Sequence, residues 1–533
     1  MKSILILGAG VMQVPGIRIA KRKGWRVIVA DGNPAALARD MADQFEAVDL
    51  KDREALLAVA RGCAAQGGLD GVFTAGTDFS SSVAWVAERM NLPGIPYETA
   101  MRATDKCLMR QAFEKAGVPS PRFACWNGQG DPRSLLASTL DFPLVVKPVD
   151  NMGARGVVRV DDEASLTDAC VRARSLSRSS RVIVEKYMEG KEFSLDAVVD
   201  GGKVTVCGVA DRHIFFPPSF VEMGHTIPTD VDMSTVGSLE KAFAAGIRAL
   251  GIDCGAAKGD IKLTAGGPMI GEIAARLSGG YMSGWTFPFS SGVEVTEAAL
   301  NIAVGLSPGE LRPRFDRVCA ERAIISIPGT VEEAAGSEAA LMVPGVEEVF
   351  FRVGPGDEVV FPANNVQKCG NIIAVGEDRS EAVAAAAAGL AAAWIRLRPL
   401  NDRTSRYLFH ESGNDAFAHI DAGLARLVAA LPPYRGDPST FASTGRIPVE
   451  PLAGAQESRA EDWYSARLPA AAAAALRRGG GDLAAGAGEE QFVLSGLFWR
   501  ALLRASAQGG VYLLQSVREG ARRGCLREFL NGI

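Results

Sequence analysis

The sequence predicts a multidomain protein that opens with an α/β domain, built on a parallel, doubly wound sheet, and continues with α+β domains. Over residues 1 to about 100, short apolar runs alternate with helical patterns, as they do in parallel sheets. From residue 141 the strand-like runs come in pairs separated by turns, as in antiparallel sheets. At about 150 residues per domain, the 533 residues give three or four domains.

The first domain is expected to have a sheet of at least three strands. Each strand is a short apolar run, and an amphipathic helical pattern follows the first of them. These elements are the strands 4–7, 26–30 and 71–74 and the helix 14–22. Ligands of doubly wound sheets bind beyond the carboxyl ends of the strands, where Gly8, Asp31 and Thr77-Asp78 stand.

The glycine turn after the first strand begins like a dinucleotide fingerprint. Gly8-Ala9-Gly10 follows the strand, and Asp31 stands where a ribose-binding acid would be expected. The third glycine is missing, because Gln13 occupies its position. A tight structural turn is therefore favoured over an NAD site.

The next elements are predicted from apolar runs, turn signals and helical spacing. Asp200-Gly201-Gly202-Lys203 is a hairpin signal. The predicted elements are a helix at 100–116, strands at 144–147, 156–160, 182–185, 193–200, 204–210, 256–263 and 269–273, and an alanine-rich helix at 380–394.

The signal weakens beyond about residue 405. Residues 430–460 are rich in Pro, Gly, Ser and Thr, as in a linker or an ordered loop. Residues 469–489 are biased towards Ala, Gly and Arg, and 492–529 has the apolar spacing of a helix. The apolar residues of this last segment are expected to pack on the core rather than at a subunit contact, namely Trp499, Leu502, Leu503, Tyr512, Leu513 and Leu514.

Composition narrows the class of function. With 57 Lys and Arg against 62 Asp and Glu, the net charge is −5, which gives no global attraction to nucleic acid or to anionic membrane. No uninterrupted apolar run reaches the length of about 18 residues that a membrane span needs. The nine cysteines form no CxxC pair and the four histidines have no metal-ligand spacing, so neither a disulfide framework nor a zinc site is expected. A reducing cytoplasm fits best.

Basic and glycine-rich segments point to an anionic ligand. Lys147 ends an apolar strand, and a buried lysine needs an anionic partner unless its ammonium reaches solvent at the sheet end. Lys106 stands at the start of a helix. The loop Gly153-Ala154-Arg155-Gly156 would expose backbone N–H groups to phosphate oxygens, although a plain hairpin turn has the same composition.

Acidic residues complete the pattern. Glu185 closes one strand and Glu192 opens the next, where they would accept from an exocyclic amine and from ribose hydroxyls unless they are merely solvated. Asp260 and Glu272 are 12 residues apart across a turn, so a hairpin would place them side by side, as a Mg²⁺ site requires. Arg276, beside a Ser-Gly-Gly run, would clamp an oxyanion or else pair with Glu272 at the surface.

In this order and spacing, these residues resemble the ATP-grasp superfamily, specifically its carboxylate–amine ligase branch, which is related to biotin carboxylase and to aminoimidazole ribonucleotide carboxylase. The resemblance covers residues 1–400. It implies a pre-ATP-grasp domain at 1–100, an ATP-grasp domain at 101–309 with a small nucleotide-covering subdomain at 120–190, and a C-terminal lobe at 310–404. Residues 405–533 resemble nothing familiar and are expected to form a mainly helical extension.

The resemblance also implies roles for individual residues. Lys106 and Lys147 would bind the nucleotide phosphates together with Gly153, Ala154, Arg155 and Gly156, and Glu185, Lys186, Tyr187, Met188 and Glu192 would bind adenine and ribose. Asp260 and Glu272 would bind Mg²⁺ or Mn²⁺, and Lys147 and Arg276 would act in catalysis. Glu222, His225, Arg276, Ser278 and Gly279 would lie near the substrate. Many relatives carry Asn where this chain has Ala274, so the metal site would lose one ligand oxygen.

The implied activity is an ADP-forming ligase that activates a carboxylate as an acyl phosphate and joins it to an amine. The substrates would be amino acids or similar small metabolites, with neither nucleic acid nor membrane as a partner and with a homodimer left open. Three alternatives remain: a bicarbonate-activating carboxylase of the same fold, a nucleotide-binding regulatory module, and an NAD oxidoreductase, which Gln13 disfavours.

Overall fold

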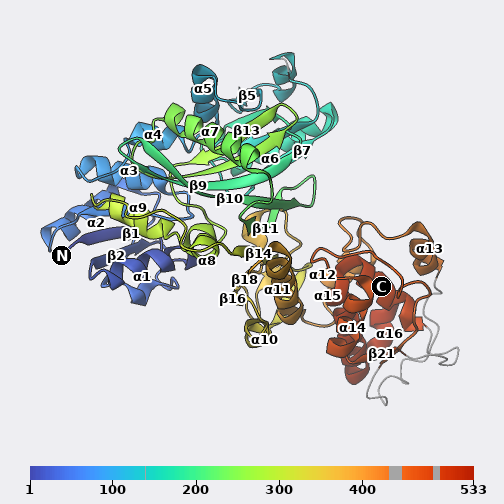
Figure 1. Ribbon diagram of the computed structural model, residues 1–533. Coiled ribbons are helices and arrows are strands. Elements are labelled where there is room, and N and C mark those ends of the chain that lie inside the picture. Colours follow the sequence, from blue (N-terminus) through green and yellow to red (C-terminus); the bar gives the residue numbers. More distant parts are fainter. Residues whose placement is uncertain (139, 431–446, 484–492) are drawn as a thin grey trace. The chain divides into compact units, whose positions relative to one another are not determined.

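A computed structural model describes residues 1–138, 140–430, 447–483 and 493–533 (Figure 1). The chain divides into two compact units. Unit 1 comprises Met1–Glu321, Ala363–Asn365 and Val375–Val383, and unit 2 comprises Arg322–Pro362, Val366–Ala374 and Ala384–Ile533. Among the residues that the structure describes, no helix is both long enough and apolar enough to cross a bilayer.

Unit 1 begins with the expected parallel sheet, in the order β3-β2-β1-β4. Its strands are β1 (Ser3–Leu7), β2 (Arg26–Asp31), β3 (Gln44–Ala47) and β4 (Gly71–Phe73), with helices α1 (Val14–Arg22), α2 (Arg53–Ala65) and α3 (Ser80–Arg89). Leu5, Leu7 and Ile28 are fully buried in its core. The sequence did not predict β3, because its residues are half-buried or exposed and form no apolar run.

Side chains of the same domain fill the glycine turn that follows β1. Gln13 Oε1 accepts from the N–H of Gly10 (3.1 Å), and its amide donates to the carbonyl of Ala75 (2.6 Å). The carboxylate of Asp31 accepts from the N–H of Ala9 (2.8 Å). Because these contacts close the turn with local side chains, they agree with a structural turn rather than with a dinucleotide site.

A small antiparallel sheet follows, in the order β5-β8-β6-β7. Its strands are β5 (Phe123–Trp126), β6 (Leu144–Pro148), β7 (Val158–Val160) and β8 (Val182–Lys186), and α6 (Glu163–Leu176) packs against it. Leu144, Val146, Val182 and Val184 form its buried core together with Leu166 of α6.

The predicted helix at 100–116 is instead two helices, α4 (Tyr97–Arg102) and α5 (Lys106–Ala116). The chain breaks there because Asp105 caps α5, accepting from the N–H groups of Cys107 and Leu108. A disulfide joins Cys107 to Cys125 of β5, although the scattered cysteines predicted no disulfide framework. Tertiary packing alone brings α5 and β5 together, and their sequence spacing gave no signal.

The larger sheet of unit 1 has the order β13-β12-β9-β10-β11, with antiparallel neighbours throughout. Its strands are β9 (Lys191–Asp200), β10 (Lys203–Phe215), β11 (Val221–Ile227), β12 (Gly255–Thr264) and β13 (Gly267–Ala274). Helix α7 (Met233–Leu250) covers one face and buries Phe243 and Ile247 against Phe193 and Ile261 (Figure 1). Helices α8 (Phe287–Ser291) and α9 (Val295–Ala303) follow.

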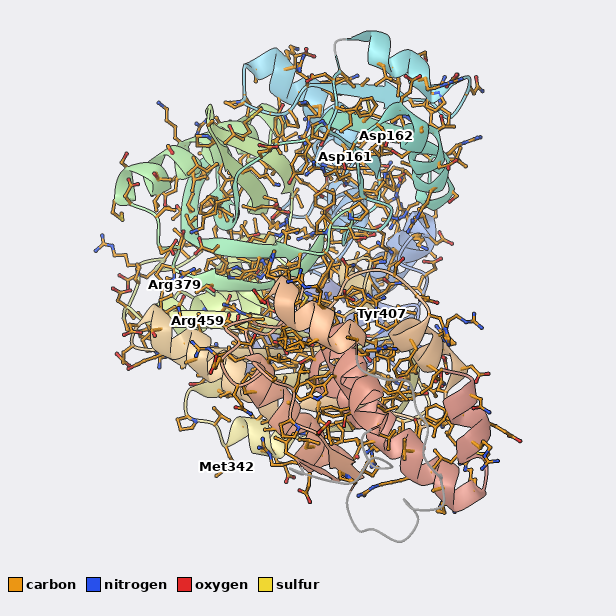
Figure 2. All side chains as sticks on the ribbon, turned by 90° about the vertical axis from the view of Figure 1, so that its right-hand side faces the viewer. Asp161, Asp162, Met342, Arg379, Tyr407 and Arg459 are labelled. Carbon is orange, nitrogen blue, oxygen red and sulfur yellow. A yellow bond between two sulfur atoms is a disulfide. The ribbon has the colours of Figure 1, made fainter. Side chains whose placement is uncertain are left out.

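Arg379, labelled in Figure 2, anchors the short segment Val375–Val383 in unit 1. Its guanidinium forms an ion pair with Asp211 of β10 and donates to the carbonyl of Pro228 (3.3 Å).

Unit 2 begins within β14 (Val318–Ile324) and is mainly helical after residue 400, as expected for the extension. Its strands are β15 (Gly329–Ala335), β16 (Val346–Phe351), β17 (Glu358–Val359), β18 (Gly370–Gly376), β19 (Trp394–Leu397), β20 (Ile447–Val449) and β21 (Gly481–Leu483). Its helices are α10 (Ser337–Leu341), the part of α11 (Arg379–Ala392) from Ala384 onward, α12 (Asp402–Phe409), α13 (Ala422–Ala430), α14 (Leu468–Gly479), α15 (Val493–Arg523) and α16 (Leu526–Asn531). The predicted helix at 380–394 ends at Ala392 because Trp394 opens β19.

The helical part of unit 2 has its own buried core. Trp499, Leu502, Tyr512 and Leu514 of α15 are buried, which confirms the predicted packing of this segment. Tyr407 of α12 lies under the guanidinium of Arg504, 4.3 Å from ring centroid to Cζ (Figure 2). The predicted linker at 430–460 and the biased segment at 469–489 lie partly outside the described residues.

Candidate active site

Lys106 is held at the amino end of α5 by its own helix cap and by the small sheet. Its backbone N–H donates to the carbonyl of Val149 (2.9 Å), and its ammonium donates to the carbonyl of Asn151 (2.8 Å). The same ammonium lies 3.7 Å from the carboxylate of Glu272. Lys106 is thus a buried cation placed between the small sheet and the larger sheet of unit 1.

Lys147 and Glu185 form a second ion pair, which Arg110 of α5 extends. Lys147 Nζ donates to Glu185 Oε2 (2.6 Å), and Arg110 Nε lies 2.9 Å from Glu185 Oε1. Arg110 also donates to the carbonyl of Gly271 (2.5 Å). Burial alone would raise the pKa of Glu185, but Arg110 and Lys147 outweigh burial and hold that pKa below its ordinary value.

Sequence reasoning missed Arg110. It follows Lys106 by one helical turn, which places both cations on the same face of α5. Its side chain is 0% exposed, and that of Glu185 is 2% exposed. An arginine so deeply buried needs a carboxylate partner, and here that partner is Glu185. Arg110 therefore holds the carboxylate of Glu185 in position.

Replacing Arg110 is expected to destabilise the protein strongly. In Arg110→Met, a buried carboxylate loses one of its two cations, and breaking a buried pair costs about 3–5 kcal/mol. Urea denaturation of Arg110→Met measures this cost. The double variant Arg110→Met with Glu185→Gln should regain part of the loss, because it removes the uncompensated charge. A cost below about 1 kcal/mol for the single variant would contradict this assignment.

The glycine loop has a left-handed backbone at three of its four residues. Gly153, Ala154 and Gly156 all have left-handed φ angles, of 67°, 60° and 74°. A Cβ at Gly156 would lie 2.9 Å from Leu176 and 3.0 Å from Pro148, so a larger residue would clash there. The loop therefore depends on glycine for its shape.

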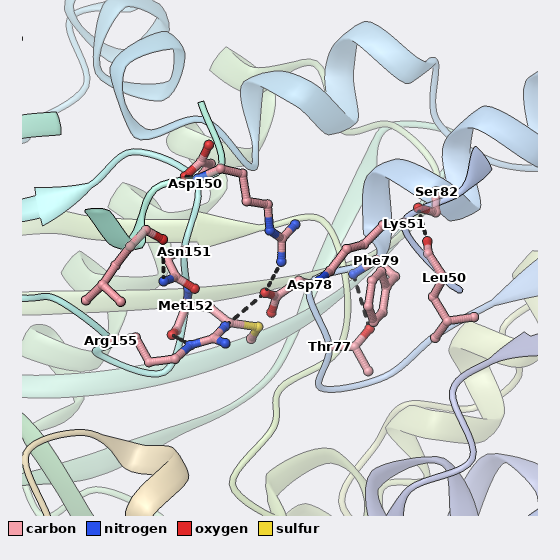
Figure 3. Close-up of polar contacts among 12 residues, drawn as sticks. Leu50, Lys51, Thr77, Asp78, Phe79, Ser82, Asp150, Asn151, Met152 and Arg155 are labelled. Atoms are coloured by element: carbon pink, nitrogen blue, oxygen red, sulfur yellow. Dashed lines mark hydrogen bonds and ion pairs between the residues drawn. The ribbon is translucent and has the colours of Figure 1, made fainter. Parts of the chain in front are cut away.

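Asp78 ties this loop to the first sheet of unit 1. Its carboxylate accepts from Arg155 Nη2 of the glycine loop (3.0 Å), as Figure 3 shows. Arg178, just after α6, donates to the same oxygen (2.6 Å). Asp78, singled out because it follows a strand end, thus contacts two arginines, one in the glycine loop and one just after α6.

The segment after β8 lies against β12. The N–H of Tyr187 donates to the carbonyl of Pro143 (3.0 Å), and Lys262 Nζ donates to the carbonyl of Met188 (3.2 Å). Lys262 also lies 3.5 Å from the carboxylate of Glu192. Lys186 points elsewhere, since its ammonium pairs with Asp141 (2.8 Å).

Arg212 of β10 connects three of the predicted site acids and was also missed from the sequence. It forms ion pairs with Glu192, with Glu222 (2.9 Å) and with Asp260 (3.3 Å). Burial alone would lower the pKa of Arg212, but these three carboxylates raise it above its ordinary value. The predicted ribose, substrate and metal acids therefore surround one guanidinium.

Asp260 and Glu272 are direct neighbours across β12 and β13, which confirms the predicted hairpin. Asp260 accepts from the hydroxyl of Ser194 (2.8 Å) and pairs with Lys258 and Arg212. Burial alone would raise the pKa of Asp260, but these two cations lower it to about 2. Burial alone would raise the pKa of Glu272 as well, but Lys106 and Lys258 lower it, so both predicted metal ligands favour the ionised form that a cation requires.

Two adjacent carboxylates are a suitable donor set for Mg²⁺, which takes one or two carboxylates and completes its shell with water and phosphate. Glu272 fits this role, because its side chain is 31% exposed and faces Lys106. Asp260 is less available as a metal ligand, because protein donors already contact both of its oxygens. Among the described residues, no group of three or more His, Cys, Asp or Glu side chains forms a metal cluster.

Arg276 is buried and does not form the surface pair with Glu272 that was considered as the alternative. Its Nε donates to the carbonyl of Thr77 (3.0 Å) and its Nη1 to that of Leu277 (2.9 Å). Ser278 donates through its hydroxyl to Asp196 of β9 (2.5 Å), a residue that the sequence did not suggest. These contacts fix the guanidinium and the loop after it.

Glu222 and His225, the predicted substrate residues of β11, lie beside this loop. A Cβ at Gly280 would stand 3.0 Å from Glu222 Oε1 and 3.2 Å from His225 Cε1. His225 lies 3.4 Å from Glu222 and 3.2 Å from Glu321. Burial alone would lower the pKa of His225, but these two carboxylates raise it to about 9.

Stability is expected to depend on the proton of His225. Folding raises this pKa from its usual value near 6.5 to about 9, so the stabilisation is complete below about pH 6.5 and is lost as the pH rises through about 9. Between about pH 6 and 10, the free energy of unfolding should fall by on the order of 3 kcal/mol more in the unaltered protein than in His225→Gln. Equal falls, measured by urea denaturation, would count against a protonated His225.

Two segments of the chain match known domain families. Residues 140–284 match the ATP-grasp domain, and residues 322–398 match the L-amino acid ligase C-terminal domain 2. The first match contains Lys147, Glu185, Asp260, Glu272 and Arg276.

The chain is also similar to individual proteins. It is 26% identical over 373 residues to the protein y4rH of Sinorhizobium fredii, covering 69% of this chain and 77% of that protein. It is 25% identical over 331 residues to carnosine synthase 1 of Gallus gallus, covering 58% of this chain but only 36% of the synthase. The crystal structure of L-amino acid ligase from Bacillus licheniformis has a TM-score of 0.65 and 25% identity, covering 75% of this chain and 99% of that one. The resemblance to the carboxylate–amine ligase branch of the ATP-grasp superfamily is thereby confirmed.

Proposed function

We propose that this ATP-grasp protein of the carboxylate–amine ligase branch joins the carboxylate of one amino acid, or of a similar small metabolite, to the amino group of another. ATP would be cleaved to ADP and phosphate. One observation carries the proposal: unit 1 contains the ion pairs of Lys106 with Glu272 and of Lys147 with Glu185, and the charge of Lys147 also lowers the pKa of Glu272. The matched domains and the similarity to L-amino acid ligase support it.

The nucleotide would lie between the small sheet and the larger sheet of unit 1. Lys106 and Lys147 would bind its phosphates, and the N–H groups of the glycine loop 153–156 would close over them. The segment 185–188 would bind adenine, and Glu192 would accept from the ribose hydroxyls. Lys262 and Arg212 hold Glu192 in place for this role.

The first step would form an acyl phosphate. A carboxylate oxygen attacks the γ-phosphorus of ATP, the bond to the β,γ-bridging oxygen breaks, and ADP leaves with the electron pair. Lys147 and Arg276 would offset the negative charge on the transferred phosphoryl oxygens. Glu272, with Asp260 beside it, would hold Mg²⁺, which when bound neutralises phosphate charge and aligns the phosphates.

The second step would form the amide bond. The neutral amine attacks the acyl carbon, phosphate leaves with the bonding electrons, and the amine gives up a proton. Phosphorylation is needed because an unactivated carboxylate has no adequate leaving group. The protein contributes position and charge, and no nucleophilic side chain is required.

The acyl substrate would lie next to Arg276, against Ser278, Gly279 and the pair Glu222 and His225. Arg276 would bind a carboxylate or phosphoryl oxygen, and the acids around His225 suit a substrate ammonium group. We further propose that the protein acts in the cytoplasm, where ATP and free amino acids are both present.

A screen of ADP release tests the proposal. The unaltered protein is incubated with Mg-ATP and with pairs of amino acids, dipeptides and small carboxylates, with single substrates as controls. We expect ADP to accumulate with particular pairs, together with a product whose mass equals the sum of the pair minus water. ADP release that needs only bicarbonate would indicate the carboxylase instead. Nucleotide binding without ADP release across the whole screen would contradict a ligase.

A further inference from the structure

Lys258 lies in the row of side chains next to the two candidate metal ligands, Asp260 and Glu272. Strand β12 pairs with β13 so that Lys258 lies opposite Ala274. It pairs with β9 so that Lys258 also lies opposite Asp196. Asp260 and Glu272 form the next row of the same face, because alternate residues of a strand point the same way.

The ammonium of Lys258 is directed at the acid beside it. It forms an ion pair with Asp260 Oδ2, which Arg212 Nη1 approaches to 3.3 Å. The other oxygen, Oδ1, accepts from the hydroxyl of Ser194 (2.8 Å). Asp260 therefore already has cationic and hydroxyl partners, and the Lys258 side chain is only 14% exposed.

Glu272 has a different environment. Its side chain is 31% exposed, and the nearest ammonium, that of Lys106, is 3.7 Å away. A divalent ion would meet less competition at Glu272 than at Asp260, because an ammonium and a metal ion repel each other at one oxygen.

The small side chain at residue 274 makes room for this lysine. Directly opposed residues of antiparallel strands have Cβ atoms about 4.5–5.5 Å apart. An asparagine at 274 would therefore share the space in front of Lys258. With Ala274, the chain lacks the side-chain oxygen that an asparagine would offer to a metal ion. The positively charged Lys258 lies opposite this position instead.

We propose that Lys258 takes the place of one divalent ion, so that the nucleotide complex holds a single Mg²⁺ at Glu272 and the Lys258 ammonium supplies the positive charge on the side of Asp260. This inference rests on the nucleotide-binding part of the proposed function and needs neither the acyl substrate nor the amine.

Counting bound Mn²⁺ tests the inference. The full-length protein is saturated with a non-hydrolysable ATP analogue and titrated with Mn²⁺, and free Mn²⁺ is read by electron paramagnetic resonance. We expect one bound ion per chain in the unaltered protein. Lys258→Met combined with Ala274→Asn should bind two, because a ligand oxygen replaces the ammonium. Lys258→Arg, which keeps the charge, should still bind one.

Lys203→Met is the matched control, because Lys203 is an exposed lysine of the same sheet. It should bind one ion. Two ions in the unaltered protein would overturn the inference, whether or not any variant folds. The inference would also be overturned if Lys258→Met combined with Ala274→Asn bound only one ion while keeping the melting temperature and the analogue affinity of the unaltered protein. Because no amino acid is present, a failed ligase screen leaves this count unaffected.

Discussion

Lys147→Met should lower the turnover of ADP formation by at least about 10²-fold. The Lys147 ammonium is half-buried beside the buried carboxylate of Glu185 at the end of β6, where water screens its charge less than in bulk solvent. In the proposed reaction, this charge offsets the negative charge that spreads over the transferred phosphoryl group. Methionine keeps the length of the side chain but removes the charge. Steady-state ADP release with a substrate pair from the screen measures the loss.

Two controls separate lost catalysis from lost structure in this experiment. Lys115→Met changes an exposed lysine of α5 and should leave turnover unchanged. Circular dichroism should show that Lys147→Met is folded, since Arg110 still pairs with Glu185. Turnover within about threefold of the unaltered protein would contradict the role of Lys147, because losing such a contact usually costs far more.

Glu272→Gln should also reduce turnover by at least about 10²-fold, and it should weaken the binding of divalent ions. The change removes the carboxylate that lies opposite Asp260 and 3.7 Å from Lys106. An amide oxygen is a weaker ligand for Mg²⁺ than a carboxylate oxygen, so a higher Mg²⁺ concentration should be needed for half-maximal activity. Turnover measured across a range of Mg²⁺ concentrations shows both effects.

The matched control for this change is Glu114→Gln, an exposed glutamate of α5. It should leave turnover and the Mg²⁺ requirement unchanged. A Glu272→Gln protein with normal turnover at low Mg²⁺ would show that the metal lies elsewhere.

Local sequence patterns predicted the parts of the fold that local patterns determine. The apolar runs before Gly8 and Lys147 became β1 and β6, and the turn between Asp260 and Glu272 became a hairpin with these residues opposed. Strand β11 was not predicted, because Glu222, Gly224 and His225 interrupt its apolar pattern. Its charged residues are buried by contacts with Arg212 and Glu321, which only tertiary structure supplies.

The same reasoning explains which site residues were missed. Arg110, Arg212, Asp196 and Lys258 each act through partners on other strands or helices, and nothing in their immediate sequence distinguishes them from solvated charges. Arg110 alone has a usable signal, because it lies one turn after Lys106. The break before α5 was also readable, since Thr104-Asp105-Lys106 is a capping sequence.

Transfer of oxygen from the carboxylate to phosphate tests the central claim most directly. An amino acid labelled with ¹⁸O in its carboxylate is incubated with ATP, Mg²⁺, the amine substrate and the protein, and the released phosphate is examined by ³¹P NMR. If an acyl phosphate forms, each phosphate carries one oxygen from the labelled carboxylate, and its resonance shifts accordingly. Phosphate without the label, released while the amide product forms, would contradict activation through an acyl phosphate.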